Sequence, residues 1–428
     1  MSDKKRLVQN FISLIFLQGT NYILPLLTLP YLVRVLGPGN YGLVAFGQAF
    51  ITYFVMLTDY GFNLSATRMI SIHREDKNKV SEIFSSVMVI KVSLMLLNFL
   101  VMISIVFSID KFSSDAMLYI LTYGLVLGNV LFPIWYFQGI ENMKYITMLN
   151  IVSKFISTVL VFVVIRGEGD YIFVPLLNSI GVVFIGIVAI WIVLVRHKVK
   201  FQLPTRHQLV YQLKEGWHVF ISQIAINLYT VSNTFILGLF ASSTVVGYYA
   251  SGEKVIKAIQ GLITPITQTV YPYISKLAAQ SYSRAFAFIK KVLFIVGSAT
   301  FVGAFIVFVL AEPAVNIILG TEYKSSVVII QILSFLPFII GLSNIFGVQT
   351  MLTFGHKKAF SRILMGSGLF NIILAFTIVP YFEHIGTAIS VLSTEIAVTV
   401  TMFIYLTIKG YRFFGNNKKQ VTWEGQDV

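Results

Sequence analysis

The sequence predicts an all-α polytopic membrane protein, with about twelve transmembrane helices in two six-helix lobes around a central cavity. Of its 428 residues, 56% are hydrophobic and only 12% are charged, whereas soluble domains have about 25% charged residues. The apolar residues also form long continuous runs, and the basic residues fall into regularly spaced segments between them. Membrane β-barrels have short alternating segments instead, so the spans are predicted to be helices.

Each helical span needs about 20 mostly apolar residues to cross a bilayer core about 30 Å thick. The first apolar run is too long for a signal-peptide core and lacks a small-residue cleavage site, so we expect it to be retained. Reading the apolar runs between polar residues predicts twelve spans, with approximate bounds: 9–36, 41–70, 83–109, 114–138, 145–165, 171–195, 216–240, 246–275, 285–311, 325–353, 359–380 and 386–408.

The basic residues predict the orientation of these spans. Of the 32 Lys and Arg residues, 23 fall in the segments on the side of the two termini, and 3 fall in the opposite loops: Lys111, Arg166 and Lys324. Cytoplasmic loops of membrane proteins carry an excess of Lys and Arg. Both termini are therefore expected in the cytoplasm, and an odd number of spans would destroy this partition.

The longest internal polar stretch divides the chain into two halves of six spans. We expect an N-terminal lobe at 1–200, a cytoplasmic loop between the lobes at 201–215, and a C-terminal lobe with a cytoplasmic tail at 216–428. An even number of spans in each half would allow a parallel internal duplication. Three small residues repeat with an offset of 205: Gly42, Ala45 and Gly47 recur as Gly247, Ala250 and Gly252. Small residues at helix interfaces would explain the same pattern.

Several kinds of chemistry are excluded by missing motifs. The chain has no Walker A phosphate loop, no H-E-x-x-H and no G-x-S-x-G sequence, and its six His residues are scattered over loops and span ends. It has no Cys, which excludes disulfides and thiolate metal sites. Basic and aromatic residues are not interleaved as in nucleic-acid interfaces. We therefore expect no enzyme activity, metal, cofactor or nucleic-acid partner.

The remaining charged residues lie inside predicted spans. They are six cations and three acids: Arg34, Arg68, Lys91, Lys154, Lys254, Lys257, Asp59, Glu253 and Glu395. Each ionisable group at a span centre costs about 2.5 to 3.5 kcal/mol on insertion scales, so such groups usually face a bundle interior or a watery cavity. The net charge of this set is positive, and a positive cavity with low-dielectric walls favours an anionic cargo.

Four of these cations lie near the middle of the bilayer by their distance from the span ends: Lys91, Lys154, Lys254 and Lys257. We predict that they attract the cargo, with Arg34 and Arg68 at the two mouths. Snorkelling of long side chains is the alternative. Arg68 also suits the cytoplasmic end of its helix, and Lys257 suits a pair with Glu253, four residues earlier.

The three acids have two interpretations. Asp59, Glu253 and Glu395 are candidate proton carriers, and structural pairing with a neighbouring Lys is the alternative. Two spans also look irregular. Span one contains Pro25 and Pro30, which bend helices. Span seven carries one polar face, for which cavity lining and contacts between helices remain alternatives: Gln223, Asn227, Thr230 and Thr234.

Three segments carry a family resemblance: VLGPGNYG at 35–42, TDYGFNLSATR at 58–68, and FPIWYFQGIENMKYI at 132–146. They resemble the first half of Wzx-type O-antigen flippases. These flippases form the polysaccharide transport branch of the MOP exporters, a superfamily that also includes the MATE transporters. The plan of twelve spans extends the resemblance over the rest of the chain, where no motif matches. The resemblance implies a MOP/MATE-like fold.

The resemblance also implies a function. A flippase of this family would move an oligosaccharide linked to undecaprenyl pyrophosphate from the cytoplasmic to the periplasmic leaflet of a bacterial inner membrane, by alternating access coupled to ions, expected to be protons. Its partners would be the lipid-linked oligosaccharide, membrane lipids and other O-antigen assembly proteins. The main alternative is a MATE-like drug or metabolite antiporter, which predicts an anionic cavity. A membrane glycosyltransferase or polymerase predicts nucleotide-sugar or acidic loop motifs, which the sequence lacks.

Overall fold

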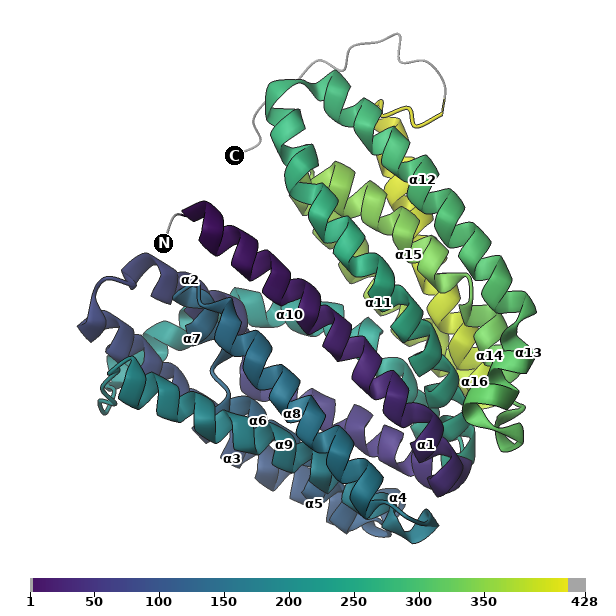
Figure 1. Ribbon diagram of the computed structural model, residues 1–428, viewed down its shortest axis with the longest axis horizontal. Helices are drawn as coiled ribbons and strands as arrows, with labels where there is room; N and C mark the ends of the chain where they lie inside the picture. Colours follow the sequence, from purple (N-terminus) through teal and green to yellow (C-terminus); the bar gives the residue numbers. More distant parts are fainter. Residues whose placement is uncertain (1–2, 415–428) are drawn as a thin grey trace.

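The computed structural model describes residues 3–414, without the side chains at 3–18, 20–23, 222, 225–226, 228–230, 262–266 and 268–269. Every regular element in this part of the chain is a helix, and it contains no strand. The predicted all-α class is confirmed. Figure 1 shows two helical bodies that meet at one end and diverge toward the end where α1 begins.

The amino-terminal body comprises residues 3–196. Its elements are α1 (Asp3–Asp59), α2 (Phe62–His73), α3 (Lys77–Ser108), α4 (Asp110–Ser113), α5 (Ala116–Thr122), α6 (Gly124–Leu131), α7 (Ile134–Gly139), α8 (Met143–Val164), η1 (Glu168–Ile172), α9 (Phe173–Trp191) and η2 (Ile192–Arg196). A loop then leads to α10 (Arg206–Phe240). Thr205 begins this helix with a capping box, in which its hydroxyl accepts from the backbone N–H of Gln208.

The carboxy-terminal body comprises residues 243–408. Its elements are α11 (Ser243–Gln280), α12 (Tyr282–Val309), α13 (Ala311–Ala314), η3 (Val315–Leu319), η4 (Thr321–Tyr323), α14 (Ser326–Leu333), α15 (Leu336–Asn344), η5 (Ile345–Leu352) and α16 (Lys357–Ile408). Short helices occupy the segment at 311–323, between α12 and α14.

Eight helical segments in the described part of the chain are long and apolar enough to cross a membrane. Two of them, at 24–73 and 357–408, have 50 and 52 residues, more than twice the length of one crossing. Each contains a sharp backbone break, at Gly37 and at Glu383. Together with the long helices α10 and α11, these segments fit the predicted bounds of the spans.

The helices break at residues that the sequence did not suggest. The bend expected at Pro25 and Pro30 stays a prediction, because α1 continues through both residues, and the residue with non-helical angles in α1 is Gly37, with φ of 69°. Span two breaks again between α1 and α2, where Tyr60 and Gly61 have φ of 47° and 73°. Spans four and ten are divided into shorter helices.

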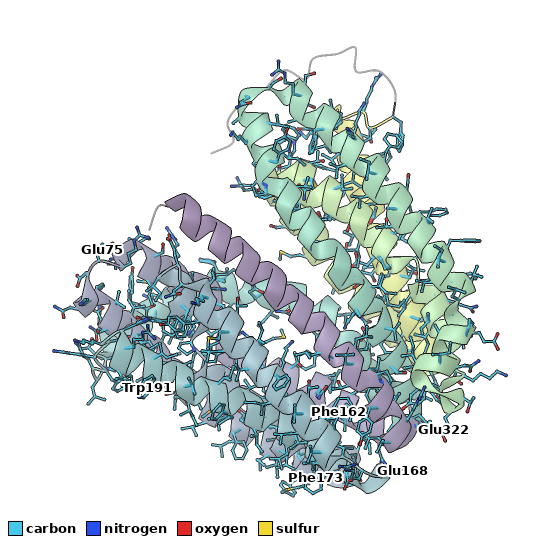
Figure 2. The ribbon with its side chains drawn as sticks, viewed as in Figure 1. Glu75, Phe162, Glu168, Phe173, Trp191 and Glu322 are labelled. Carbon is cyan, nitrogen blue, oxygen red and sulfur yellow. The ribbon has the colours of Figure 1, made fainter. Side chains whose placement is uncertain are left out.

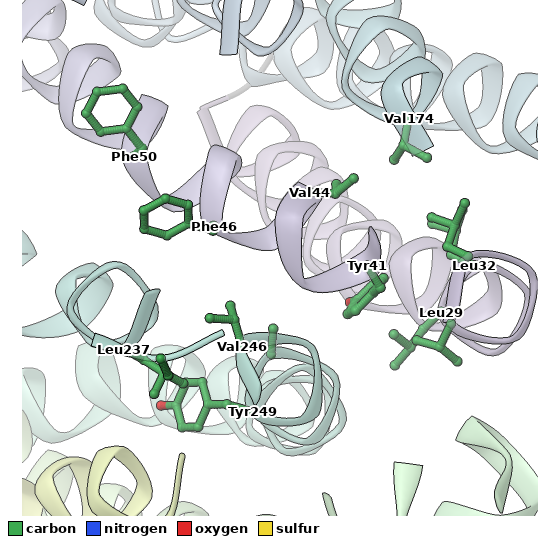
Figure 3. Close-up of a cluster of buried hydrophobic side chains, with 14 of the residues drawn as sticks. Leu29, Leu32, Tyr41, Val44, Phe46, Phe50, Val174, Leu237, Val246 and Tyr249 are labelled. Carbon is green, nitrogen blue, oxygen red and sulfur yellow. The ribbon is translucent and has the colours of Figure 1, made fainter. Parts of the chain in front are cut away.

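Three hydrophobic cores hold the bodies. One core lies in each body, around Phe84 and Trp135 in the amino-terminal body and around Phe286 and Phe346 in the carboxy-terminal body. The third contains residues of both bodies. Figure 3 shows part of it, where Tyr41 and Phe46 of α1 lie close to side chains of α10 and α11. The bodies are therefore joined by apolar packing where they meet.

α10 packs against both bodies. Near its beginning, Gly216 lies against the Tyr60 ring, which stacks on Phe220 with ring centroids 4.5 Å apart. Near its end, Phe240 contacts the Phe376 ring of α16 with a centroid distance of 5.8 Å. The division of the chain into lobes at 1–200 and 216–428 remains a prediction, because this helix contacts both bodies.

The outer sides of the bodies are apolar. Phe162, Phe173 and Trp191 are labelled in Figure 2 on the amino-terminal body, and 40%, 40% and 58% of their surfaces are exposed. Exposed aromatic side chains at this density suit a lipid environment rather than water. The same figure labels Glu168 and Glu322 where the bodies meet, and Glu75 at the opposite end.

Candidate functional site

A cavity of about 410 Å³ is lined almost entirely by the amino-terminal body, and Lys254 of the carboxy-terminal body completes its wall. Its walls come from both segments of α1, from α6, α8 and α9, and from α11. Its apolar lining includes Leu32, Val44 and Val161. Its polar lining is formed by one tyrosine, two lysines and a set of neutral side chains: Tyr41, Lys154, Lys254, Thr28, Gln48, Thr52, Asn150, Ser153, Ser157, Thr158 and Asn178.

The two lysines approach this cavity from different bodies. Lys154 lies on α8, in a turn shared with Ser153 and Ser157, whereas Lys254 lies on α11. Both are half-buried, and the Lys254 ammonium lies 5.9 Å from the centre of the Tyr41 ring, within the range of a cation–π contact. The described cavity lining contains no acidic residue. The cavity therefore carries two positive charges without a counter-charge in its wall.

The neutral polar wall retains unused hydrogen-bonding capacity. Asn150 donates to the carbonyl of Ile146 at 2.8 Å and keeps its own side-chain oxygen. Gln48, Thr158 and Asn178 make no side-chain hydrogen bond within the described part of the chain. Polar groups inside a membrane protein are costly unless they find partners. These side chains are therefore suited to hydroxyl or amide groups of a ligand.

A second pocket, of about 160 Å³, lies within the carboxy-terminal body and against α10. Its lining includes Glu253, Lys257 and Glu395. The Lys257 ammonium lies 3.0 Å from a Glu253 carboxylate oxygen, so the pair expected from their spacing is present. The other polar lining residues are neutral: Asn233, Gln260, Asn371 and Thr394. α11 thus presents Lys254 to the first cavity and its neighbour Glu253 to the second.

Lys91 lies outside both cavities, in a buried network of the amino-terminal body. Its ammonium is 2.9 Å from a carboxylate oxygen of Asp59 and 3.2 Å from the Asn129 side-chain oxygen. The second Asp59 oxygen accepts from Asn63 at 2.6 Å. Only 1% of the Lys91 side chain is exposed. This geometry corresponds to the alternative of structural pairing for Asp59, and it places Lys91 in a buried ion pair, neither in the cavity nor snorkelling toward the membrane surface.

The two arginines lie away from both cavities. Arg34 is exposed where the bodies meet and donates to the backbone carbonyl of Ile317. Arg68 is exposed on α2, in the part of span two that lies toward the termini. Of the nine charged residues predicted from the sequence, the structure therefore brings Lys154 and Lys254 to one cavity, and Glu253, Lys257 and Glu395 to the other.

The predicted polar face of span seven also lies outside these cavities. Gln223, Asn227 and Thr234 are partly buried on α10 but line neither one, and the Thr230 side chain lies outside the described residues. Instead, α10 contributes Asn233 to the second pocket. Sequence reasoning also missed Gln48, Asn150 and Asn178. The sequence feature that could have identified these three residues is an amide side chain within a predicted span.

The chain matches known proteins along most of its length. Residues 7–278 match the model of the family described as polysaccharide biosynthesis protein. A protein of Escherichia coli K12 named as an O-antigen transporter is 36% identical over 405 residues, which are 95% of this chain and 98% of that protein. A Shigella dysenteriae protein of the same name is 29% identical over 92% of this chain and 98% of its own length.

Solved structures share the fold. An inward-facing multidrug resistance MATE transporter of the MOP superfamily has a TM-score of 0.69 at 13% identity, covering 93% of this chain and 98% of its own. The lipid II flippase MurJ, in an inward closed conformation, has a TM-score of 0.69 at 15% identity, covering 94% and 89%. An outward-facing MATE transporter has 0.59 at 14% identity, covering 95% and 96%. The predicted MOP/MATE-like fold is confirmed.

Proposed function

The chain belongs to the polysaccharide biosynthesis protein family, and from this premise we propose that it is a flippase for an oligosaccharide linked to undecaprenyl pyrophosphate. The single observation that carries the proposal is the cavity with two lysines and no acid in its described lining. A diphosphate needs cations, and a positive, membrane-enclosed cavity attracts it. A transporter of cationic drugs would need the opposite charge.

The diphosphate would bind between Lys154 and Lys254. Because these lysines belong to different bodies, an anion between them would contact both sides of the transport path. Two ammonium groups facing one cavity repel each other, and a bound dianion would replace that repulsion with attraction. Substrate binding would therefore favour the approach of the two bodies. This is the step that alternating access requires.

The neutral wall would bind the sugars next to the diphosphate. Asn150, Thr158 and Asn178 of α8 and α9 offer donors and acceptors that the protein leaves unused, and Gln48 adds a further amide from α1. Such groups suit sugar hydroxyl and acetamido groups. The polyprenyl chain would stay in the lipid, since its transfer into a polar cavity would lose the hydrophobic contribution of the bilayer.

We assign the open end of the molecule to the cytoplasm. The open end contains the beginning of α1 and the loop around Glu75, as Figures 1 and 2 show. The segments predicted on this side hold most of the Lys and Arg residues, which supports a cytoplasmic location. The higher TM-score to the inward-facing MATE transporter than to the outward-facing one supports the same assignment. Cargo would then enter from the cytoplasmic leaflet and leave toward the periplasm.

The second pocket would serve ion coupling. Glu395 lines it together with the Glu253–Lys257 pair, and its carboxylate makes no salt bridge within the described residues. Proton uptake at Glu395 would remove a charge from the core of the carboxy-terminal body. Because α11 lines both cavities, a change in this pocket would reach Lys254 through one helix. Asp59 is left to its pair with Lys91.

Binding of a purified probe tests the proposal. The probe is a short-chain polyprenyl diphosphate carrying one N-acetylated sugar, and binding to the detergent-solubilised protein is measured by thermophoresis. A charged hydrogen bond contributes about 1.5 to 3 kcal/mol, so Lys154→Gln and Lys254→Gln should each weaken binding about 10- to 100-fold. The matched control is Lys324→Gln, at an exposed lysine that does not line the cavity.

A comparator ligand separates this function from drug transport. The parent protein should not bind tetraphenylphosphonium, a lipophilic cation, in the same assay. Tight binding of that cation, together with unchanged probe binding by both lysine variants, would reject the flippase proposal in favour of a MATE-like antiporter. If the proposal is correct, the parent protein in reconstituted vesicles should transfer the glycosylated diphosphate between leaflets, and the two lysine variants should do so at much lower rates.

A further inference from the structure

Where the bodies meet, two cationic side chains of the amino-terminal body donate hydrogen bonds to backbone carbonyls beyond it. Lys111 of α4 donates to the carbonyls of Leu239 and Ala241 at 3.0 and 3.3 Å, at the end of α10. Arg34 of α1 donates to the carbonyl of Ile317 in η3. These two contacts join separate pairs of elements at the same end of the molecule, and neither involves a carboxylate.

The acceptor carbonyls lie at helix ends. α10 ends at Phe240, and η3 ends at Leu319. The last carbonyls of a helix have no partner within it and carry partial negative charge, so cations bind there favourably. A third contact runs the other way, since the Tyr323 hydroxyl donates to the Val33 carbonyl at 3.1 Å. Of these contacts, only the Tyr323–Val33 contact is fully buried, whereas the Arg34–Ile317 and Lys111–Leu239 contacts are exposed to solvent.

Beneath these contacts the two bodies touch backbone to backbone. A Cβ atom on Gly42 of α1 would lie 1.7 Å from the Ser243 carbonyl oxygen, and one on Gly247 of α11 would lie 2.0 Å from the Pro38 carbonyl oxygen. Real Cβ atoms do not approach so closely, so only glycine fits at both positions. Gly42 and Gly247, one pair of the repeated small residues, therefore lie at a backbone contact between the bodies, where a separation of the bodies would expose backbone.

We propose that Lys111 and Arg34 form a latch that holds the bodies together at the end opposite the termini. The inference rests on the proposed alternating-access transport, in which this end must open after the other end closes. Carbonyl acceptors suit a contact that opens and closes, because both partners regain water when the bodies separate. In an ion pair, by contrast, the two opposite charges would still attract each other after the contact breaks, and this attraction would oppose opening. Loss of the latch should raise the population of the open form.

The absence of cysteine from the sequence allows a direct test. Val246, which is 1% exposed, lies on α11 beneath the latch and is replaced by cysteine. A membrane-impermeant maleimide is added to intact spheroplasts, so that it reaches the protein from outside the cell. Opening is measured as the rate of labelling. Because the parent chain has no cysteine, every labelled molecule reports this one position.

In this background Arg34→Gln should raise the labelling rate roughly tenfold, the change that corresponds to loss of one charged hydrogen bond. Lys111→Gln should raise it by at least as much, because Lys111 donates two such bonds. The matched control is Arg166→Gln. Arg166 donates from Nε to the Val163 carbonyl at 3.0 Å within its own body, so its loss should leave labelling unchanged. Parent-like labelling in both latch variants would overturn the inference.

Conservative variants separate latch loss from misfolding. Lys111→Arg and Arg34→Lys keep a cationic donor, and labelling should return near the parent rate. Labelling as fast as in the Gln variants would show that bulk packing, not the charged donor, holds this end, and would also reject the latch. Binding of the glycosylated polyprenyl diphosphate is measured in parallel. If that binding fails in the parent while the labelling results hold, the proposed cargo is wrong and the latch stands.

Discussion

Lys91 and Lys254 both lie near the middle of predicted spans, but only Lys91 has a carboxylate partner inside its own body. Lys91 is enclosed, 2.9 Å from Asp59, with Asn129 as a second acceptor. Lys254 faces a cavity of about 410 Å³ with a second lysine and no acid in its described lining. One charge is neutralised inside its own body, and the other faces a cavity in the wall of the opposite body, where a ligand can reach it.

The difference teaches that depth in the membrane does not identify a binding residue. A buried charge is costly in either place. For Lys91, the ion pair with Asp59 offsets the free-energy cost of burying the charge. For Lys254, the cost is reduced because the side chain is only half-buried and faces a cavity that water can enter. A functional charge is recognised by the missing counter-charge, and this requires knowledge of neighbours that are distant in sequence. Three predictions follow from the contrast, beginning with the largest effect.

Removal of the Lys91 charge should destabilise the protein strongly. Lys91→Met leaves Asp59 without its counter-charge, which should lower the free energy of unfolding in detergent by about 3 kcal/mol, at the low end for breaking a buried pair. The low end applies because 19% of the Asp59 side chain is exposed. Denaturant unfolding measures the change. The double variant with Asp59→Asn should recover much of the loss, and an equally unstable double variant would contradict the pairing argument.

A carboxylate placed in the cavity should pair with Lys154, as Asp59 pairs with Lys91, and leave Lys154 less available to a ligand. Asn150→Asp puts a carboxylate four residues before Lys154 on the same helix, the favourable order for an ion pair. Affinity for the polyprenyl diphosphate probe should fall roughly tenfold, about 1.4 kcal/mol, although both lysines remain. Asn150→Ser removes the amide without adding charge and serves as the control. Equal loss in both variants would mean that the amide matters more than the charge.

The smallest effect concerns a titratable side chain just beyond a membrane-spanning segment, His197. Burial, with a smaller contribution from Arg196, lowers the pKa of His197 below its usual value, and the Tyr136 hydroxyl lies 3.0 Å from its Nδ1. Because the folded state favours neutral His197, its stability contribution is present above about pH 6.5 and is lost as the pH falls below that value. The unfolding midpoint should therefore drop by about 2 °C between pH 7 and 5.5.

The matched variant His197→Gln keeps a hydrogen-bonding side chain without a titrating group. Its unfolding midpoint should depend less on pH over the same range than that of the parent. An identical pH dependence in parent and variant would mean that other groups control stability there. His356, whose pKa is also lowered by burial and by Lys409, is the alternative source and can be replaced in the same way.

The sequence predicted the helical class and the approximate spans because apolar runs are a one-dimensional signal. It also predicted that charges in the spans matter, and it paired Glu253 with Lys257 from their spacing on one helix. It could not pair Lys91 with Asp59, which lie on different helices and 32 residues apart. The amide-lined walls were missed because single Asn or Gln residues in apolar runs suit packing between helices equally well.

The segments that resembled a family lie mainly at backbone breaks, and of these segments only VLGPGNYG contributes a side chain to the cavity, that of Tyr41. VLGPGNYG contains the break at Gly37 and the close contact of Gly42, and TDYGFNLSATR contains the left-handed residues Tyr60 and Gly61. Only glycine tolerates such a contact, and glycine adopts such angles without strain. Backbone geometry restricts the choice of residue more than a polar cavity wall does. A family pattern therefore identifies the scaffold more clearly than the cargo.

The contact of α10 with both bodies has a consequence for synthesis of the chain. Tyr60 and Gly61 complete their packing only against residues 216–220, which leave the ribosome about 160 residues later, or roughly 10 to 30 s at ordinary rates of elongation. During this interval, the first six helices are in the bilayer with one face uncovered. A chain that stops near residue 200 should therefore be recognised by quality-control proteases, and co-expression of the missing half should protect it.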